Sequence, residues 1–283
     1  MKENHRICAG IILYNPDLNR LVENIDSIIS QVNEVVIIDN ASNNSDEIQI
    51  CLKNKGEKLV YLRNHENFGI AKALNQILDF AVQRYYDAFI TLDQDSICGN
   101  ELVENYLNID FDGIGQISCV ITDRNTGTVD CTSFDDSNVK KVESVITSGC
   151  LNVTNAIKTV GGFDESLFID GVDIDLSLRL KQREYEILKI NYHGLLHELG
   201  QGKKKRILGR DFILSNHNPI RNYYTRRNMI YIARKYYSGI KKHKMIIKQI
   251  IYGIGASVLE DQKIKRIKCN LKGIKDGLCR NIN

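Results

Sequence analysis

Prolines, long apolar runs and paired cysteines are scarce or missing in this sequence of 283 residues. Only two prolines and no low-complexity segment occur, so composition marks no linker between domains. No window approaches 18 uninterrupted apolar residues, so we expect no membrane-spanning helix. The eight cysteines form no C-x-x-C pair, and Cys8 and Cys119 lie within apolar runs. Because the opening MKENHRICAG is not a signal peptide pattern, we expect buried thiols in a reducing cytoplasm and no disulfide framework.

The charges are divided unevenly along the chain. Residues 201–283 carry 21 Lys and Arg against 4 Asp and Glu, whereas residues 1–200 carry 17 against 31, so the net charge of +3 combines a tail of +17 with a body of −14. A basic tail on an acidic body predicts attraction to phosphates, an acidic membrane surface or nucleic acid. A solvated lysine-rich surface is the alternative interpretation.

The first half of the chain alternates strand and helix patterns. Apolar runs predict strands at 7–15, 34–42, 58–64 and 86–93, and amphipathic patterns predict helices at about 17–29, 46–55 and 69–84. Further strands are expected at 113–122 and 144–154, around a polar loop at 123–143, and a strand followed by a loop at 186–202. A helix is predicted from near Val172, and a basic helical region from about 219. Repeated βα units predict an α/β fold with a mainly parallel, doubly wound sheet.

Polar residues follow three of the predicted strands where each strand ends. They are Tyr14, Asp39, and the pair Asp93 and Asp95 in the segment LDQDS. Ligands of such sheets bind beyond the carboxyl ends of the strands. A single D-x-D is weak evidence, but its position on an edge shared with Asp39 predicts a site for a nucleotide and a metal ion.

Seven motifs in order carry a family resemblance. LYNP, IIDNAS, ENFGIAKALN, LDQDS, TSGC, VGGFDESLFIDGVDIDLSLRL and HELG together closely resemble the family 2 glycosyltransferases of the GT-A fold, over roughly residues 7–235. The spellings LDQDS and FIDGVD, and the closing LKGIKDGLCR, are most similar to bacterial rhamnosyltransferases. The resemblance implies a GT-A catalytic domain at 1–235, with a nucleotide-binding half at 1–98 and an acceptor half at 99–235. A basic amphipathic helical extension follows at 236–283.

The resemblance implies that Asp39 and Tyr14 bind the nucleotide. A carboxylate accepts a strong hydrogen bond from the N3–H of uracil or thymine, and the family has its base-contacting aspartate at the position of Asp39, with Tyr14 near the ring or the ribose. Both bases share this imide edge, so Asp39 does not distinguish UDP from dTDP donors. Asp39 and Asn40 form, in the alternative interpretation, only a strand-terminating Asx turn.

Asp93 and Asp95 are the predicted metal ligands. Carboxylate and diphosphate oxygens favour Mg²⁺ or Mn²⁺. The resemblance implies that Asp95 binds the ion and that Asp93 lies near the ribose or in the water shell of the ion. His197, in HELG, corresponds to a histidine that reaches the metal or the diphosphate in some GT-A enzymes. The alternatives are a polar turn for the aspartates and a structural role for His197.

Asp173 is the predicted catalytic base. GVDIDLSLR resembles the family element GED-x-(D/E)-x-x-x-R, whose aspartate deprotonates the acceptor hydroxyl during inverting transfer. Val172 replaces the usual glutamate, and Asp170 is expected to supply a compensating polar contact on the acceptor side. The alternative is an acidic helix N-terminus favoured by the helix dipole, with Asp175 as its structural member.

Further residues are assigned to the sugar and phosphate groups. Ser148 and Gly149 are expected to line the sugar pocket. The segment NPIRNYYTRRN resembles the R-x-YY-x-x-RN element of the family, so one of its arginines is expected to meet a diphosphate, and Arg227 is assigned to the acceptor side.

These assignments predict an inverting, metal-dependent glycosyltransferase. The predicted donor is dTDP-L-rhamnose, and the predicted acceptor is a hydroxyl of a glycan or polyprenyl-diphosphate-linked intermediate of polysaccharide or O-antigen. UDP-glucose, UDP-galactose or another pyrimidine sugar nucleotide is the alternative donor. A nucleic-acid-binding protein is a distant alternative, because the sequence has no RRM, KH or helix-turn-helix signature.

The last residues, 241–283, mix lysines with Ile, Met, Leu and Val at near-helical spacing. This pattern suits a helix on an anionic lipid leaflet, and it also suits an amphipathic helix packed on the catalytic domain. The first interpretation predicts a cytoplasmic enzyme at the inner face of the cytoplasmic membrane.

Overall fold

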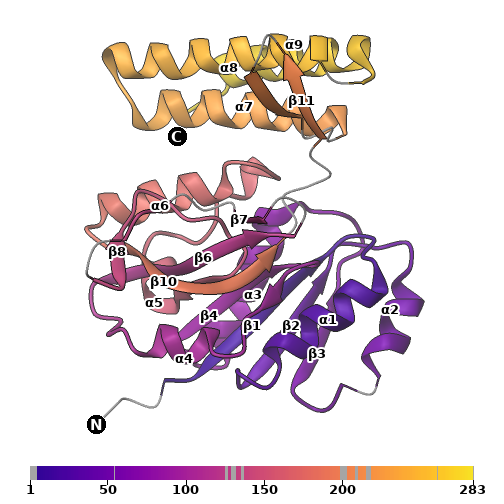
Figure 1. The fold of residues 1–283 in the computed structure, drawn as a ribbon, viewed down its shortest axis with the longest axis vertical. Coiled ribbons are helices and arrows are strands. Elements are labelled where there is room, and N and C mark those ends of the chain that lie inside the picture. Colours follow the sequence, from indigo (N-terminus) through magenta and orange to yellow (C-terminus); the bar gives the residue numbers. More distant parts are fainter. Residues whose placement is uncertain are drawn as a thin grey trace. The chain divides into compact units, whose positions relative to one another are not determined.

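The computed structural model divides the chain into two compact units. The described residues are 5–53, 55–124, 127–128, 132–134, 137–197, 203–207, 210–214, 218–259 and 261–282. One unit, the sheet unit, comprises Met1–Ser166 and Asp173–Glu198, and the other, the helical unit, comprises Leu167–Val172 and Leu199–Asn283. Figure 1 shows the sheet and its helices in the first, and three long helices in the second.

A ten-stranded mixed sheet forms the centre of the sheet unit. The strands run in the order β3 (Leu59–Arg63), β2 (Glu34–Asp39), β1 (Ile7–Leu13), β4 (Ala88–Asp93), β9 (Cys150–Val153), β6 (Ile114–Asp123), β10 (Glu186–His197) and β5 (Ile97–Cys98). Strands β3, β2, β1 and β4 are parallel, β9 is antiparallel to β4 and β6, and β6 is parallel to β10. Short β7 (Gly127–Thr128) and β8 (Val139–Lys141) pair with β6 and β10 within the predicted polar loop. The predicted α/β fold and its parallel βα units are confirmed.

The helices of the sheet unit include four that apolar periodicity predicts and two short ones that the sequence did not predict. The predicted helices are α1 (Leu18–Ile28), α2 (Ser45–Leu52), α3 (Ile70–Gln83) and α6 (Val172–Gln182), and the others are α4 (Leu102–Leu107) and α5 (Thr154–Thr159), with a 3₁₀ turn at Glu165–Leu167. Asp17 caps α1 by accepting from the Arg20 amide, which satisfies one free N–H of the first turn. Gly10 of β1 lets α3 approach closely, since a Cβ there would lie 2.5 Å from the Ile77 side chain.

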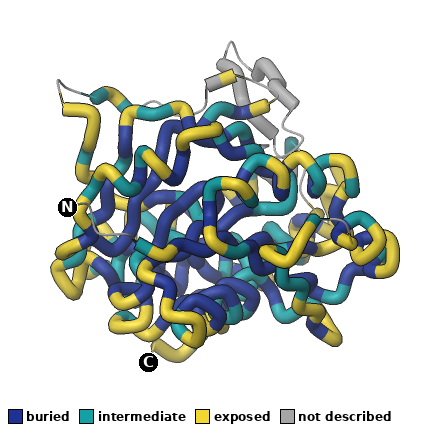
Figure 2. Tube along the Cα trace, turned by 90° about the horizontal axis from the view of Figure 1, so that it is seen from below, coloured by how far each residue is buried: buried dark blue, intermediate teal, exposed yellow. Residues whose placement is uncertain are grey.

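The core contains four of the cysteines as free thiols. Cys8, Cys98, Cys119 and Cys150 are buried. Figure 2 shows how buried segments, in dark blue, alternate with exposed ones, in yellow, along the chain. Burial raises the pKa of Cys98 to about 12 and that of Cys119 to about 11, because a thiolate would lose its hydration there. The predicted buried thiols are thus confirmed for these four.

The helical unit consists of α7 (Pro219–Tyr236), α8 (Gly239–Leu259) and α9 (Lys263–Cys279), together with a hairpin of β11 (Lys203–Ile207) and β12 (Arg210–Leu214). The sequence did not predict this hairpin, and part of the predicted loop, at 198–202, lies outside the described residues. Asn218 caps α7 by accepting from the Ile220 amide. Within the described part of the chain, no helix is long and apolar enough to cross a bilayer.

The grouping of α7 differs from the predicted domain boundary near residue 235. Helix α7 belongs to the helical unit because α9 packs tightly against its backbone. A Cβ at Gly277 would lie 2.7 Å from the Arg227 carbonyl oxygen, and one at Gly273 would overlap the Tyr223 carbonyl oxygen. Glycines at these positions allow contact between the two helix backbones.

Candidate functional site

An acidic turn follows β4 at the carboxyl edge of the parallel strands. Asp93 and Asp95 keep 36% and 26% of their side-chain surface exposed. The backbone of the turn is held from both sides, because the Ser148 hydroxyl accepts from the Asp93 amide at 3.1 Å and the Asn24 amide group donates to the Asp93 carbonyl at 2.6 Å. The turn therefore presents two accessible carboxylates on a fixed main chain.

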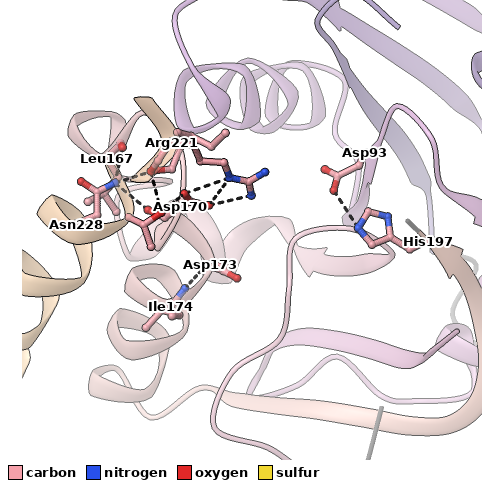
Figure 3. A network of polar contacts seen from close by, with 10 residues as sticks. Asp93, Leu167, Asp170, Asp173, Ile174, His197, Arg221 and Asn228 are labelled. Atoms are coloured by element: carbon pink, nitrogen blue, oxygen red, sulfur yellow. Dashed lines mark hydrogen bonds and ion pairs between the residues drawn. The ribbon is translucent and has the colours of Figure 1, made fainter. Parts of the chain in front are cut away.

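His197 lies between these two carboxylates, as Figure 3 shows for its contact with Asp93. Its Nε2 is 3.6 Å from Asp93 Oδ2, and its Nδ1 is 3.7 Å from Asp95 Oδ1. Ser96 Oγ lies 3.0 Å from the same Nδ1 and 2.7 Å from Ser148 Oγ. The imidazole is buried, so the two serines fix the ring while its Nε2 faces the first aspartate.

Strand pairing explains why these residues meet. The two residues of β5, directly after the turn, pair with the end of β10, with Ile97 opposite Leu196 and Cys98 opposite Leu195. This register brings Ser96 next to His197, about a hundred residues away in sequence. A bulge in β10 near His193 shifts the register between β10 and β6.

The two carboxylates of the turn suit a hard divalent metal ion whose other ligands would come from a substrate and from water. Within the described residues, no three His, Cys, Asp or Glu side chains form a group able to hold a metal ion by themselves. Mg²⁺ in such sites usually takes one or two carboxylates, with phosphate oxygens and water as the other ligands. Asp93 and Asp95 match that protein contribution.

Asp39 ends β2 on the same edge, and it is fully buried. Its Oδ1 accepts from the Ser42 amide at 2.9 Å, and its Oδ2 accepts from the Tyr61 hydroxyl at 2.6 Å. Arg63 Nε lies 3.8 Å from Oδ2. The bond to Ser42 stabilises the turn after β2, and a carboxylate has acceptor capacity beyond these two bonds. Burial and the hydrogen bond to Asp39 raise the pKa of Tyr61, so its hydroxyl stays a donor.

Tyr14 stands at the end of β1 with 51% of its surface exposed. Its amide donates to the Gln94 side chain at 2.9 Å, which ties the end of β1 to the acidic turn. Asn15 adopts a left-handed conformation with φ of 49°, and its side chain accepts from the Asn43 amide. These bonds leave the Tyr14 ring available at the edge that also carries Asp39.

The two aspartates at the start of α6 have different surroundings. Asp173 is half-buried, and its Oδ1 accepts from the Ile174 amide at 2.9 Å. Asp175 is fully buried and pairs with Arg179 Nε at 2.7 Å. Arg179 also donates to the carbonyls of Val160 and Gly162. Asp175 therefore stabilises the glycine loop before α6, as expected of a structural member.

The loop at 167–172 belongs to the helical unit and leads along the chain into α6. Phe168, Asp170 and Gly171 have φ values of 60°, 65° and 81°, so the backbone is left-handed at three of four consecutive positions. Such residues are strained unless their surroundings hold them. Asn228 provides this support, since its buried amide group donates to the carbonyls of Leu167, Ile169 and Asp170.

The Asp170 carboxylate of this loop is hydrogen-bonded to two residues of α7. It accepts from Arg221 Nη2 at 2.9 Å and Nε at 3.1 Å, and from the Thr225 hydroxyl at 2.7 Å (Figure 3 shows the pair with Arg221). Both groups come from α7. Asp170 thus attaches its loop to α7, a contact that sequence reasoning did not identify.

The remaining predicted residues have local supporting contacts. Ser148 and Gly149 are buried beneath the acidic turn, where Gly149 donates its amide to the Thr91 carbonyl at 2.8 Å with φ of 70°. Arg227 donates to the Leu167 carbonyl and lies over the Tyr224 ring at 4.9 Å. Arg226 is buried and donates to Gln249.

The sheet unit therefore brings together Asp93, Asp95, His197 and Ser148, with Tyr14 and Asp39 on the same edge. Sequence reasoning missed Ser96, Tyr61 and Arg63, which support these side chains. Arg63 ends β3 on this edge and keeps 49% of its side chain exposed. The rule that found Asp39, a polar residue at the end of a strand, would also have found Arg63.

Comparison with known proteins gives matches over the whole chain. A family model described as glycosyl transferase family 2 matches residues 8–155. The dTDP-rhamnosyl transferase RfbF of Shigella flexneri is 25% identical over 311 residues, which cover 97% of this chain and 96% of that protein.

Three solved structures with a similar fold contain nucleotides, and two of the three also contain Mn²⁺. GalNAc-T7 with UDP, GalNAc and Mn²⁺ has a TM-score of 0.62 at 14% identity, over 98% of this chain, which spans 57% of that chain. The mannosyltransferase PcManGT from Pyrobaculum calidifontis, with GDP-Man and Mn²⁺, has a TM-score of 0.58 at 13% identity over 98% of this chain and 76% of that chain. S. aureus TarS 1-349 with UDP has a TM-score of 0.54 at 14% identity over 96% of this chain and 89% of that chain.

Proposed function

The chain belongs to glycosyl transferase family 2, and we propose that it transfers L-rhamnose from dTDP-L-rhamnose, with inversion, to a hydroxyl of a lipid-linked polysaccharide intermediate. The observation that carries this proposal is the acidic turn after β4. There the imidazole of His197 lies within 4 Å of both Asp93 and Asp95, on the edge that also carries Asp39. The rhamnosyl donor is supported by the similarity to RfbF and by the spelling LDQDS.

Asp39 and Tyr14 would bind the nucleotide. The Asp39 carboxylate would accept a hydrogen bond from the N3–H of thymine, while the hydrogen bonds from Tyr61 and Ser42 keep it oriented. Tyr14, at the end of the neighbouring strand, would contact the ring or the ribose with its exposed side chain. Arg63, which is half-exposed beside Asp39, is available to a phosphate of the same nucleotide.

Asp95 and Asp93 would hold Mn²⁺ or Mg²⁺, which would stabilise negative charge on the departing diphosphate. His197 would orient the site, because Ser96, itself hydrogen-bonded to Ser148, holds the imidazole with its Nε2 toward Asp93. Ser148 and Gly149 would support the acidic turn from its buried side, because the Ser148 hydroxyl accepts a hydrogen bond from the Asp93 amide. Their position under the turn supports a role in shaping the sugar pocket.

Asp173 would act as the base. The acceptor hydroxyl proton would move to the Asp173 carboxylate as the acceptor oxygen bonds to the anomeric carbon. The bond between that carbon and the diphosphate oxygen would break with its electron pair on the diphosphate, which inverts the anomeric configuration. Asp170, Arg227 and Asn228 would serve the acceptor side by holding the loop that leads along the chain into α6.

UDP-glucose or UDP-galactose is the second candidate donor, because thymine and uracil offer Asp39 the same imide edge. A lipid-linked acceptor would bring the enzyme to the inner face of the cytoplasmic membrane. The basic C-terminal helices would meet anionic lipids there.

Calorimetry with UDP, dTDP, dTDP-L-rhamnose, UDP-glucose and GDP-mannose, each with Mn²⁺ and with EDTA, tests the proposal. We expect binding of pyrimidine nucleotides only, with dTDP-L-rhamnose preferred, and a loss of at least about tenfold in affinity with EDTA or in Asp95→Ala. Asp110→Ala, which removes an exposed carboxylate elsewhere in the sheet unit, is the control. Equal binding of GDP-mannose, or affinity unchanged by EDTA, would contradict the proposal.

A further inference from the structure

Within the helical unit, α8 and α9 bury polar and small residues where helices of a bundle in water bury apolar ones. The buried residues of α9 are Arg266, Asn270, Gly273 and Gly277. On α8, the buried residues among those whose side chains are described are Gln249, Gly253 and Ser257. None of these seven carries a large apolar side chain. The buried positions of α8 and α9, among the described side chains, are therefore polar or glycine and not aliphatic.

Hydrogen bonds and close backbone contacts hold these helices together instead. The Asn270 amide group donates to the Gly253 carbonyl at 3.0 Å and to Ser257 Oγ at 2.9 Å. Arg226 of α7 donates to Gln249 Oε1 at 2.9 Å, and Arg266 donates to Asn222 at 2.7 Å. Association through small residues and polar side chains is typical of helices that face lipid, where apolar surface gives no drive to associate.

Large apolar side chains of both helices point outward. On α8 they recur at helical spacing and are 55–76% exposed: Ile240, Ile247, Ile251 and Ile254. On α9 they recur in the same way and are 43–73% exposed: Ile264, Ile267, Leu271 and Leu278. In each helix the members lie three, four or seven residues apart, so they form one stripe. The two helices pack side by side within the helical unit (Figure 1).

Lysines flank these stripes. A hollow of about 450 Å³ on α8 is lined by Lys241, Lys244 and Lys248 together with Ile240 and Met245. Within the described part of 239–282, the acidic residues are Asp261 and Asp276, and the Asp276 carboxylate accepts from the Tyr223 hydroxyl. The surface therefore offers apolar side chains beside a concentrated positive charge.

We propose that the exposed stripes of α8 and α9 insert into the interfacial region of an anionic bilayer, with the flanking lysines on lipid phosphates. Within their described residues, neither helix is long and apolar enough to cross the bilayer, and both would lie in the plane of the interface. A second copy of the chain fits less well, because pairing these surfaces would oppose lysine to lysine. The proposal rests on the helical unit alone and does not depend on the identity of the sugar donor.

The absence of tryptophan provides a sensitive test. Ile251→Trp puts a single indole in the α8 stripe, and Ile50→Trp puts one on α2, where Ile50 is 72% exposed. Both full-length proteins are titrated with vesicles of phosphatidylglycerol and phosphatidylcholine in equal parts, and with phosphatidylcholine alone. We expect a blue shift of the indole emission of Ile251→Trp with anionic vesicles only, and none for Ile50→Trp. No shift at position 251, or an equal shift at both positions, would overturn the proposal.

Vesicle co-sedimentation with charge variants separates lipid binding from self-association. Ile247→Glu/Ile251→Glu should lower the partition coefficient at least about tenfold, and Lys241→Gln/Lys244→Gln/Lys248→Gln by a similar factor or more. Ile50→Glu is the matched control and should leave the partition coefficient unchanged. Nucleotide binding, measured on the same samples, should be equal in all variants, so a failure here is distinct from a failure of the proposed function. A dimer that Ile247→Glu/Ile251→Glu dissociates, with no vesicle binding, would identify a second copy as the partner and overturn the proposal.

Discussion

Two aspartates two positions apart at the start of α6 differ in what surrounds them, and this difference supports the proposal that Asp173 is the base and Asp175 a structural residue. Asp173 is half-buried, whereas Asp175 is fully buried in an ion pair with Arg179. A buried charge whose partner is removed is costly, while a general base is needed only when the acceptor is deprotonated. The pair therefore allows catalysis and stability to be tested by the same substitution at neighbouring positions.

Asp173→Asn should lower transfer of rhamnose by about 10²-fold or more, because the loss of a general base typically costs about 10²–10⁴. Its nucleotide affinity and melting temperature should stay near those of the wild type. Asp175→Asn should instead lower the free energy of unfolding by roughly 3 kcal/mol, because Arg179 would lose its carboxylate. Labelled transfer to a bacterial membrane extract and denaturant titration measure the two effects. Near wild-type transfer by Asp173→Asn would show that another group is the base.

Asp39→Asn should weaken binding of dTDP and UDP by about tenfold or more. Hydrogen bonds to a charged group contribute about 1.5–3 kcal/mol, and the neutral amide supplies a weaker acceptor to the imide N3–H. Asp46→Asn removes an exposed carboxylate from the first turn of α2 and is the control. Calorimetric titration measures both. Unchanged affinity in Asp39→Asn would leave only the turn with Ser42 as the function of Asp39.

At the scale of elements, short strands and glycines decide which distant residues meet. Strand β5 has only two residues, yet its pairing with β10 brings His197 to the acidic turn. Gly273 and Gly277 similarly bring α9 onto the backbone of α7. Neither effect follows from hydrophobic periodicity, because two-residue strands and single glycines leave little pattern in the sequence.

Glycines of α8 and α9 should respond oppositely to alanine. Gly273→Ala should lower the free energy of unfolding by about 1–3 kcal/mol, because its Cβ would overlap the Tyr223 carbonyl oxygen, which belongs to the backbone and moves little. Gly255 lies within α8 with open space around it, so Gly255→Ala should raise the free energy by about 0.5–1 kcal/mol through helix propensity. Chemical denaturation measures both. Stabilisation by both substitutions would mean that α9 does not contact α7 at Gly273.

At the scale of the whole molecule, the segregation of charge matters more than its sum. A net charge of +3 alone would predict weak attraction to anionic surfaces, but residues 201–283 carry +17. The helices and the hairpin that bear most of this charge belong to one compact unit with exposed apolar stripes. An anionic partner would therefore meet this local charge and not the net charge of the chain.

Binding to anionic vesicles should fall steeply with salt. Raising NaCl to about 0.5 M reduces the Debye length to roughly 4–5 Å, which screens the lysines from lipid phosphates. We expect the partition coefficient to fall at least about tenfold, while pyrimidine nucleotide binding at the sheet unit changes less. Co-sedimentation at several salt concentrations measures this. A partition coefficient independent of salt would show that the apolar stripes act without the lysines.

The order of βα units, the acidic turn and the start of α6 near Val172 could all be predicted, because local periodicity and strand-end polarity are properties of contiguous residues. The occupation of Asp170 by Arg221, the burial of Ser148 and the meeting of Asp93 with His197 could not be predicted from spacing. These depend on strand order and helix packing between distant segments. The basic helical tail was likewise expected from sequence, but which of its side chains face outward was set by packing. There, glycines, Asn270 and Arg266 occupy the interior, and Ile247, Ile251 and Ile264 remain exposed.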